Sequence, residues 1–184
     1  LNGKPVQRIS ADLSGDGGGV DLTTARLLPQ NAGVSFEGTK KYGDFDISGE
    51  LARSWLRLPN PHGKTNAEVL KPWRNGQGIT MRPSDSWIID FGAELDETDA
   101  ALFEAPFAHV LHFVKPVRVK AKLPKNWWLH ERPRSAMRVA LISLARYIAT
   151  VRVSKHRFFV FLDATVLPDT RLNVIARADD TTLG

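Results

Sequence analysis

Residues 135–162, with the sequence SAMRVALISLARYIATVRVSKHRFFVFL, decide the fold class because a helix pattern runs directly into strand patterns. Apolar residues recur at helical spacing from Met137 to Ala145, which predicts a helix over about 135–146. The runs 147–153 and 158–162 are rich in β-branched and aromatic residues and predict two strands. The basic segment Ser154-Lys155-His156-Arg157 is left as the tip of a hairpin.

Helix and strand patterns also alternate irregularly over the rest of the chain. A helix is expected from Ser48, which can cap it, and another from Pro106, which suits a first turn. Strand-like segments are expected at about 4–12, 33–38, 44–47, 69–70 and 87–91, with a glycine-rich loop at 15–19. Strands both before and after helices predict an α+β fold, with a mixed, largely antiparallel sheet and three or more helices.

Composition excludes several classes of protein. The 184 residues are 42% apolar and contain no cysteine, which excludes disulfides and thiolate metal sites and fits a reducing compartment. No apolar run is long enough to span a bilayer, so we expect no membrane partner and a cytoplasmic location. The chain begins without Met, and we expect it to be a piece of a longer protein. The Pro/Gly-rich segment 59–83 is a candidate boundary between two lobes.

Charge is distributed unevenly along the chain. From Lys115 to Arg157 there are twelve Lys and Arg residues and one acid, Glu131, whereas the first 114 residues have more acids than bases. A concentrated basic segment in a folded domain indicates a surface that meets a polyanion, with nucleic acid as the first candidate.

Two groups of side chains in the basic segment are candidate DNA contacts. The candidates for phosphate contacts are Arg118, Lys120, Lys122, Arg132, Arg134 and Arg138. The candidates for groove contacts are Arg152, Ser154, Lys155, His156 and Arg157, because a hairpin loop fits the major groove and Arg and Lys can address guanine. The alternative for both groups is an ordinary solvated surface.

Trp127-Trp128 could stack on a base, but adjacent residues of a strand point to opposite faces. We therefore expect one of the two indoles to be in the core and the other to be partly exposed.

No set of residues assembles into a catalytic or metal centre. His109 and His112 are spaced as helical neighbours, but no third ligand is evident. We therefore assign no catalytic residue, no metal ligand and no cofactor to this chain, and expect it to be inactive alone.

Several short motifs, in this order along the chain, resemble one bacterial family. They are Asn31-x-Gly33-x-Ser35-Phe36-x-Gly38, Gly43-Asp44-Phe45, residues 87–92, residues 114–118, Trp127-Trp128-x-His130-x-Arg132-Pro133-Arg134 and residues 147–157. The set resembles the target recognition domain of MmeI-like restriction-modification enzymes and related adenine-specific DNA methyltransferases, including those of phage-defence systems. The resemblance extends over nearly the whole chain, which makes 1–184 one recognition domain.

The resemblance implies a module that grips duplex DNA and reads base edges. In that family a separate methyltransferase domain precedes it, uses S-adenosylmethionine and flips adenine at an Asn-Pro-Pro-aromatic motif. Here Asn60-Pro61-His62 is the only near match to that motif. The catalytic domain of the same polypeptide is therefore an expected partner that lies outside this chain, and an attached endonuclease is a further option.

Two other function classes stay open at this point. An RNA-binding module would suit the basic segment and the paired indoles, although no RNP or Gly-x-x-Gly motif occurs. A stand-alone metal-dependent nuclease could use Asp85, Asp90 or Glu94, but it would need a catalytic lysine that the pattern does not place.

Overall fold

The computed structural model describes residues 5, 26 and 28–183, except for residues 83, 123 and 124. The chain divides into two compact units, Leu1–Ala32 and Gly33–Gly184. Of the first unit, the short 3-10 helix η2 (Pro29–Asn31) is described. The strand expected at 4–12 and the glycine-rich loop at 15–19 lie outside the described residues.

The first sheet of the second unit has four strands in the order β2-β4-β3-β7. These strands are β2 (Asp46–Ser48), β4 (Ser86–Ile89), β3 (Leu70–Arg74) and β7 (Leu167–Pro168). The pairs β2–β4 and β3–β4 are antiparallel, whereas β7 runs parallel to β3, with Trp73 opposite Leu167. A segment from near the C-terminus thus completes a sheet built from residues 46–89.

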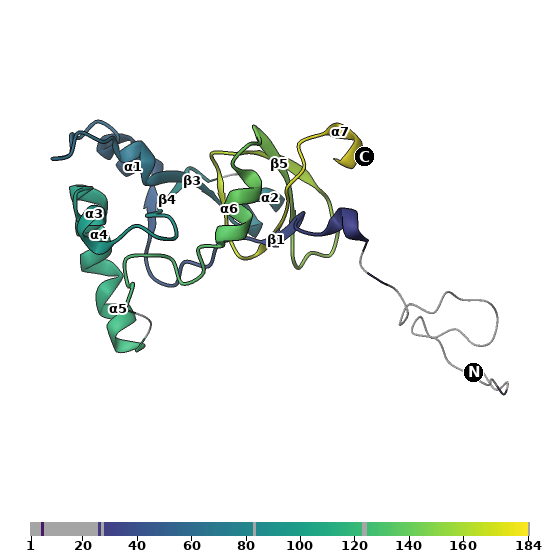
Figure 1. Ribbon diagram of the computed structural model, residues 1–184, viewed down its shortest axis with the longest axis horizontal. Coiled ribbons are helices and arrows are strands. Elements are labelled where there is room, and N and C mark those ends of the chain that lie inside the picture. The colour runs from purple at the N-terminus through teal and green to yellow at the C-terminus, as the bar shows by residue number, and fades with distance from the viewer. Residues whose placement is uncertain (1–4, 6–25, 27, 83, 123–124, 184) are drawn as a thin grey trace. The chain divides into compact units, whose positions relative to one another are not determined.

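Short helices cover the core beside this sheet. They are α1 (Gly49–Trp55), the 3-10 helix η3 (Asn66–Glu68), α3 (Glu97–Ala101), α4 (Glu104–Phe113) and α5 (Lys115–Lys120). Ser48 caps α1 by accepting a hydrogen bond from the Leu51 backbone N–H at 3.2 Å, as the sequence predicted. Phe45, Ile88 and Val110 are fully buried in this core. In Figure 1, α3, α4 and α5 lie at the end of the unit away from β5 and α7.

The second sheet is antiparallel throughout and has the order β1-β8-β5-β6. Its strands are β1 (Ser35–Glu37), β8 (Leu172–Ile175), β5 (Arg146–Val151) and β6 (Val160–Asp163). The other helices of the unit are α2 (Gly76–Thr80), α6 (Ser135–Leu141) and α7 (Asp180–Leu183). Met137 and Leu141 of α6 pack with Tyr147, Ala149 and Val174 in a second, smaller core.

The α+β fold with largely antiparallel sheets is therefore confirmed, but the elements at 135–162 differ in their bounds. The helix expected to reach residue 146 ends at Leu141. The chain turns at this point, and Ile142 is 86% exposed. The strands expected at 147–153 and 158–162 are residues 146–151 and 160–163. The connection between them is consequently residues 152–159, twice the length that the sequence pattern indicated.

The two sheets are joined by the segment that leaves β1. Thr39 forms a bridge to Asp169, and Lys40 forms a bridge to Arg132. Gly38 is required where this segment starts, because a Cβ there would collide with the backbone carbonyl oxygen of Asp169. The division expected near 59–83 and the extent of the domain stay predictions, although β2 and β4, on either side of that segment, belong to one sheet.

No helix within the described residues is long and apolar enough to cross a membrane.

Candidate nucleic-acid interface

The β5–β6 connection, residues 152–159, is an exposed basic loop at the end of the second sheet. Lys155, His156 and Arg157 are exposed, and no hydrogen bond or ion pair of the Lys155 and His156 side chains occurs within the described residues. Arg157 Nη2 donates to the Arg152 carbonyl oxygen at 3.3 Å, which curls the loop back on its own start. The loop therefore presents cations to solvent, as the sequence predicted.

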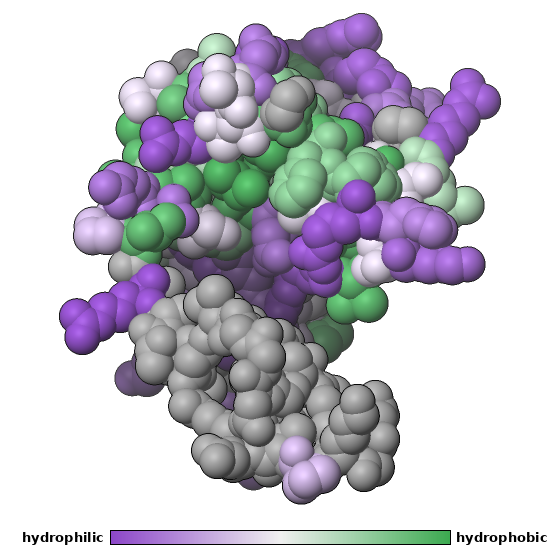
Figure 2. All heavy atoms as spheres, turned by 90° about the vertical axis from the view of Figure 1, so that its right-hand side faces the viewer, coloured by the Kyte–Doolittle hydropathy of each residue, from purple (hydrophilic) through white to green (hydrophobic). Residues whose placement is uncertain are grey.

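Apolar side chains share this loop with the cations. Val153 is 88% exposed, and Phe158 and Phe159 are exposed as well, although they were expected to lie in a strand. Ser154 Oγ donates to the His156 carbonyl oxygen at 2.6 Å, so its hydroxyl hydrogen is used within the loop. Figure 2 views the end of the unit that carries the second sheet and shows hydrophilic side chains projecting around a centre of apolar ones.

Arg152, at the start of the loop, is held by the neighbouring strands. Its guanidinium pairs with Glu37 of β1 and donates to the Thr170 carbonyl oxygen at 3.1 Å. Arg134 pairs with the other carboxylate oxygen of Glu37, so one acid bridges two arginines. The cluster of Glu37, Arg134 and Arg152 contains two cations and one anion, so it has a net positive charge.

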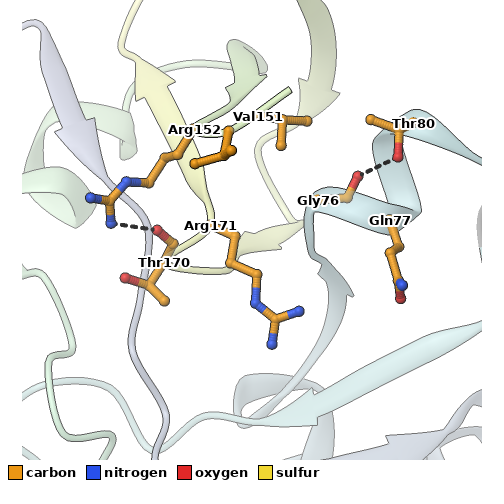
Figure 3. Close-up of a pocket in the computed structure, with 8 residues that line it drawn as sticks. Gly76, Gln77, Thr80, Val151, Arg152, Thr170 and Arg171 are labelled. Carbon is orange, nitrogen blue, oxygen red and sulfur yellow. Dashed lines mark hydrogen bonds between the residues drawn. The ribbon is translucent and has the colours of Figure 1, made fainter. Parts of the chain in front are cut away.

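A pocket of about 470 Å³, here called the α2 pocket, lies beside the start of this loop. It is lined by Gly76, Gln77, Thr80, Val151, Arg152, Val153, Thr170 and Arg171. Figure 3 shows α2 on one side of it and Arg152 with Arg171 on the other. The lining contains two arginines and no acid, so the pocket favours an anionic or hydrogen-bond-accepting ligand.

Arg171 and Gln77 were not among the residues that the sequence patterns singled out. Arg171 follows Pro168-Asp169-Thr170 in an acidic part of the chain, well outside the basic segment. Gln77 lies in Asn75-Gly76-Gln77-Gly78, a composition typical of loops, yet it belongs to a short helix. Neither residue belongs to a periodic sequence pattern. The residues that face each of them across the pocket are determined by long-range strand pairing.

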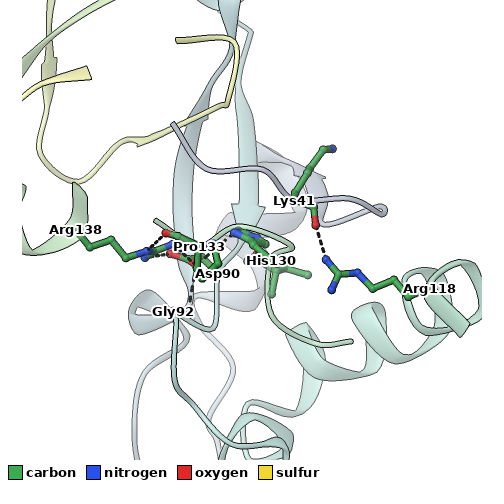
Figure 4. A network of polar contacts seen from close by, with 8 residues as sticks. Lys41, Asp90, Gly92, Arg118, His130, Pro133 and Arg138 are labelled. Atoms are coloured by element: carbon green, nitrogen blue, oxygen red, sulfur yellow. Dashed lines mark hydrogen bonds and ion pairs between the residues drawn. The ribbon is translucent and has the colours of Figure 1, made fainter. Parts of the chain in front are cut away.

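Arg118 is a correction to the sequence-based set of phosphate contacts. It is 2% exposed, and its guanidinium donates to the backbone carbonyl oxygens of Lys41 at 2.5 Å and Tyr42 at 2.9 Å. Burial lowers the pKa of Arg118 from its ordinary value. The side chain thus fixes the segment at Lys41–Tyr42 from inside the protein and is not available to a phosphate in this structure (Figure 4).

Arg138 is engaged in a second internal contact. It donates to both carboxylate oxygens of the buried Asp90, at 2.8 and 2.9 Å, and to the Pro133 carbonyl oxygen at 2.6 Å (Figure 4). Burial alone would raise the pKa of Asp90, but the charge that His130 carries at low pH, together with the charge and the hydrogen bonds of Arg138, lowers it. Arg138 thereby ties α6 to the end of β4, next to the first core.

His130 completes a group of Asp90, Arg118, His130 and Arg138, here called the buried junction, in which the first three are buried and the Arg138 side chain is 24% exposed. Its Nε2 lies 2.9 Å from the Ile89 carbonyl oxygen, and its Nδ1 lies 3.7 Å from Asp90 Oδ1. Burial, the largest influence, lowers the pKa of His130 to about 4, against the opposing pull of Asp90. The imidazole is therefore neutral at pH 7.

Lys120, Lys122 and Arg132 are exposed, and no ion pair or hydrogen bond of their side chains occurs in the part of the chain that is described. They remain available for phosphate contacts. The lysine and arginine candidates thus divide into exposed cations, cations paired with Glu37, and cations bound to protein acceptors, whereas the Ser154 hydroxyl is used within its own loop.

The tryptophan expectation was wrong in two respects. Trp127 and Trp128 lie in a turn and not in a strand, and both are buried, with 7% and 8% of their surfaces exposed. Trp128 Nε1 donates to the Leu95 carbonyl oxygen at 2.9 Å, and the Lys115 ammonium lies 4.5 Å from the centre of the Trp127 ring. Both indoles therefore belong to the first core, and neither offers a free face for a base.

Among the described residues, no group of three or more His, Cys, Asp or Glu side chains could hold a metal ion. Asp85, one of the candidate nuclease acids, forms an exposed ion pair with Arg53 at 2.8 Å. Asp90 is buried against Arg138. His109 Nε2 lies 3.1 Å from the Asp44 carbonyl oxygen, which gives that side chain a local partner.

No protein-family model and no curated protein matches this chain. Its structure is similar to that of the Type IIL restriction-modification enzyme MmeI, which was solved in complex with DNA. The match has a TM-score of 0.54 and 18% sequence identity, and it covers 95% of this chain and 23% of that one. This chain therefore shares its fold with a segment of a restriction-modification enzyme and spans less than a quarter of that enzyme's length.

Proposed function

We propose that this chain is a sequence-specific duplex DNA recognition module of an adenine-specific DNA methyltransferase or of a fused restriction-modification enzyme. The β5–β6 connection carries the proposal, because Lys155, His156 and Arg157 are exposed in one loop with no acid among residues 152–159. Major-groove readers present cations in this way, since Arg and Lys can reach guanine O6 and N7. The fold shared with a DNA-bound restriction-modification enzyme supports the same function.

Exposed cations elsewhere would provide the sequence-independent part of binding. Lys120, Lys122 and Arg132 are the best remaining candidates for phosphate contacts, since each is exposed. Such contacts position a protein on the duplex but carry no sequence information. Arg118 and Arg138 are assigned to stability instead, because their guanidinium groups are occupied by protein acceptors.

The chemistry on the base is assigned to a methyltransferase domain of the same polypeptide, with S-adenosylmethionine as methyl donor. The described residues nearest in sequence to the adenine-binding motif of that domain do not fit its role. Asn60, in the only near match to the adenine-binding motif, is buried and donates to the Lys64 carbonyl oxygen and to Asn66 Oδ1, both at 2.9 Å. An S-adenosylmethionine loop and an Asn-Pro-Pro-aromatic motif encoded upstream of Leu1 would support this assignment, and a different upstream domain would contradict it.

The binding function is tested by titrating the 184-residue chain with duplex DNA at salt concentrations from about 50 to about 200 mM. With about five phosphate contacts, the affinity should fall about 500-fold over this range. A flat salt response, or tighter binding to RNA of the same sequence than to duplex DNA, would contradict the proposal.

A further inference from the structure

The α2 pocket combines two side chains that are suited to reading bases. We infer that Gln77 and Arg171 read base edges of duplex DNA at the mouth of this pocket, in addition to the β5–β6 connection. The inference rests on the proposed function and deepens it, because it names specificity-determining residues outside the basic segment.

Arg171 is held at one edge of its guanidinium and free at the other. Its side chain is 67% exposed, and its Nε lies 3.5 Å from Asp169 Oδ1. Asp169 is itself fixed, since it is 5% exposed and its Oδ1 accepts the Arg171 backbone N–H at 2.8 Å. No other contact of the guanidinium with an acceptor occurs within the described residues, so its outer N–H groups can make the bidentate contact that guanine O6 and N7 accept.

Gln77 is placed by a helix that is tightly fixed to the second sheet. Asn75 caps α2 by accepting the Gly78 N–H at 2.9 Å, and Thr80 Oγ1 donates to the Gly76 carbonyl oxygen at 3.0 Å. A Cβ on Gly76 would lie 3.2 Å from Val151 Cγ1, so glycine permits α2 to approach β5 closely. The exposed carboxamide of Gln77 is thus held beside the pocket, with one donor and one acceptor to offer adenine N6 and N7.

The surroundings favour DNA over a neutral or cationic ligand. Figure 3 shows the Arg171 guanidinium and the Gln77 carboxamide directed to the same side of the pocket. Gln77 also borders a second hollow of about 280 Å³, whose lining includes Arg82 and no acid. Two further pockets of the described structure include the acidic residue Asp90 in their linings. The basic hollows thus flank α2, where a polyanion can approach.

The test is a selection from a randomised duplex library by the 184-residue chain, followed by affinity measurements on single-base variants of the selected site. The variants are Arg171→Ala, Arg171→Lys, Gln77→Ala and Gln77→Glu. Arg57→Ala is the matched control, because Arg57 is exposed and lies outside the pocket lining. Thermal unfolding of each variant is measured alongside.

We expect Arg171→Ala and Gln77→Ala each to lose discrimination at its own position, by about 5- to 150-fold, with the rest of the site preference intact. Arg171→Lys should lose most of the same discrimination, because lysine lacks the planar fork. Gln77→Glu should change the preferred base toward cytosine, whose amino group a carboxylate accepts. A changed preference cannot result from unfolding.

Two results overturn the inference while leaving the proposed function intact. In the first, the pocket variants keep the wild-type preference at every position. In the second, they lose affinity equally for all sequences, which would make the two residues phosphate contacts. If the wild-type chain itself selects no sequence from the library, the proposed function fails together with the inference.

Discussion

The arginines of the buried junction and the cations of the β5–β6 connection come from the same basic run, Lys115 to Arg157, yet they are used in opposite ways. In the buried junction, Arg118 and Arg138 donate to backbone carbonyls and to Asp90. In the connection, Lys155 and Arg157 are exposed and face solvent. A local excess of positive charge along the sequence therefore does not say which of its cations face solvent and which are occupied by protein acceptors.

The difference has a physical cause. A buried guanidinium must have its donors satisfied, and the cost of leaving its partners unpaired is large. An exposed lysine has only a screened interaction with its neighbours and is free to exchange water for a phosphate or a base. Substitutions in the two regions should consequently separate stability from DNA binding.

The largest expected effect is on the stability of the buried junction. Arg138→Met should lower the free energy of unfolding by about 3–5 kcal/mol, because it leaves the Asp90 carboxylate buried without its bidentate partner. Urea denaturation measures this change. Arg157→Met should alter stability by no more than about 0.5 kcal/mol, as is usual for an exposed site. Equal stability of the two variants would contradict the expectation that the buried junction stabilises the fold and the connection does not.

The second effect is a pH dependence that originates at His130. Its pKa is lowered to about 4 in the folded chain from 6.5, so below about pH 6.5 the unfolded chain binds a proton that the native chain does not. Stability should therefore fall by about 3 kcal/mol as the pH is lowered from about 6.5 to about 4. Asp90, whose pKa is lowered, loses its contribution only at still lower pH.

His130→Gln should remove most of this pH dependence, as measured by urea unfolding at a series of pH values. His156→Gln is the matched control, since His156 is exposed in the β5–β6 connection. If the control flattened the profile and His130→Gln did not, the buried junction would not be the source of the dependence.

A smaller effect is expected on sequence discrimination by the connection. Lys155→Ala or Arg157→Ala should change the preferred site, at a cost of about 1–3 kcal/mol for each base edge that the variant no longer reads. Competition binding against single-base variants of the selected site measures it. A uniform fall in affinity would mean that the connection holds the DNA backbone and that base reading resides elsewhere, for example at the α2 pocket.

The smallest expected effect belongs to the exposed cations outside the connection. Lys120→Ala and Arg132→Ala should each weaken binding to all sequences alike and reduce the slope of log affinity against log salt by about one unit. Titrations at several salt concentrations give the slope. Unchanged slopes would mean that these two residues do not contact DNA phosphates. The proposed DNA contacts would then lie on the second sheet and on α2.

Local patterns were sufficient for much of the fold. The cap at Ser48, the helix expected at Pro106 and the strand expected at 147–153, which is residues 146–151 in the structure, each depend on residues close in sequence. The bounds at Leu141 and Val160 were not predictable in this way. Packing of the turn after Leu141 against the second core outweighs the helical spacing, and periodicity alone cannot report that competition.

The candidate site was predicted only where its signals lie close together in the sequence. The connection at Lys155–Arg157 was identified because charge and hairpin signals coincide in one stretch. Arg171 and Gln77 were missed, since they are brought together by the pairing of β5 with β8 and by the close approach of Gly76 to Val151.

Composition and short-range spacing were enough to establish the α+β class, the concentration of positive charge between Lys115 and Arg157, and the absence of cysteine chemistry. The three-dimensional arrangement was needed to establish which arginines are occupied inside the protein and which face solvent. That division depends on carbonyl and carboxylate acceptors such as Lys41 and Asp90, which lie 77 and 48 residues away along the chain from Arg118 and Arg138. Short-range patterns carry no information about partners at such separations, because folding alone brings them together.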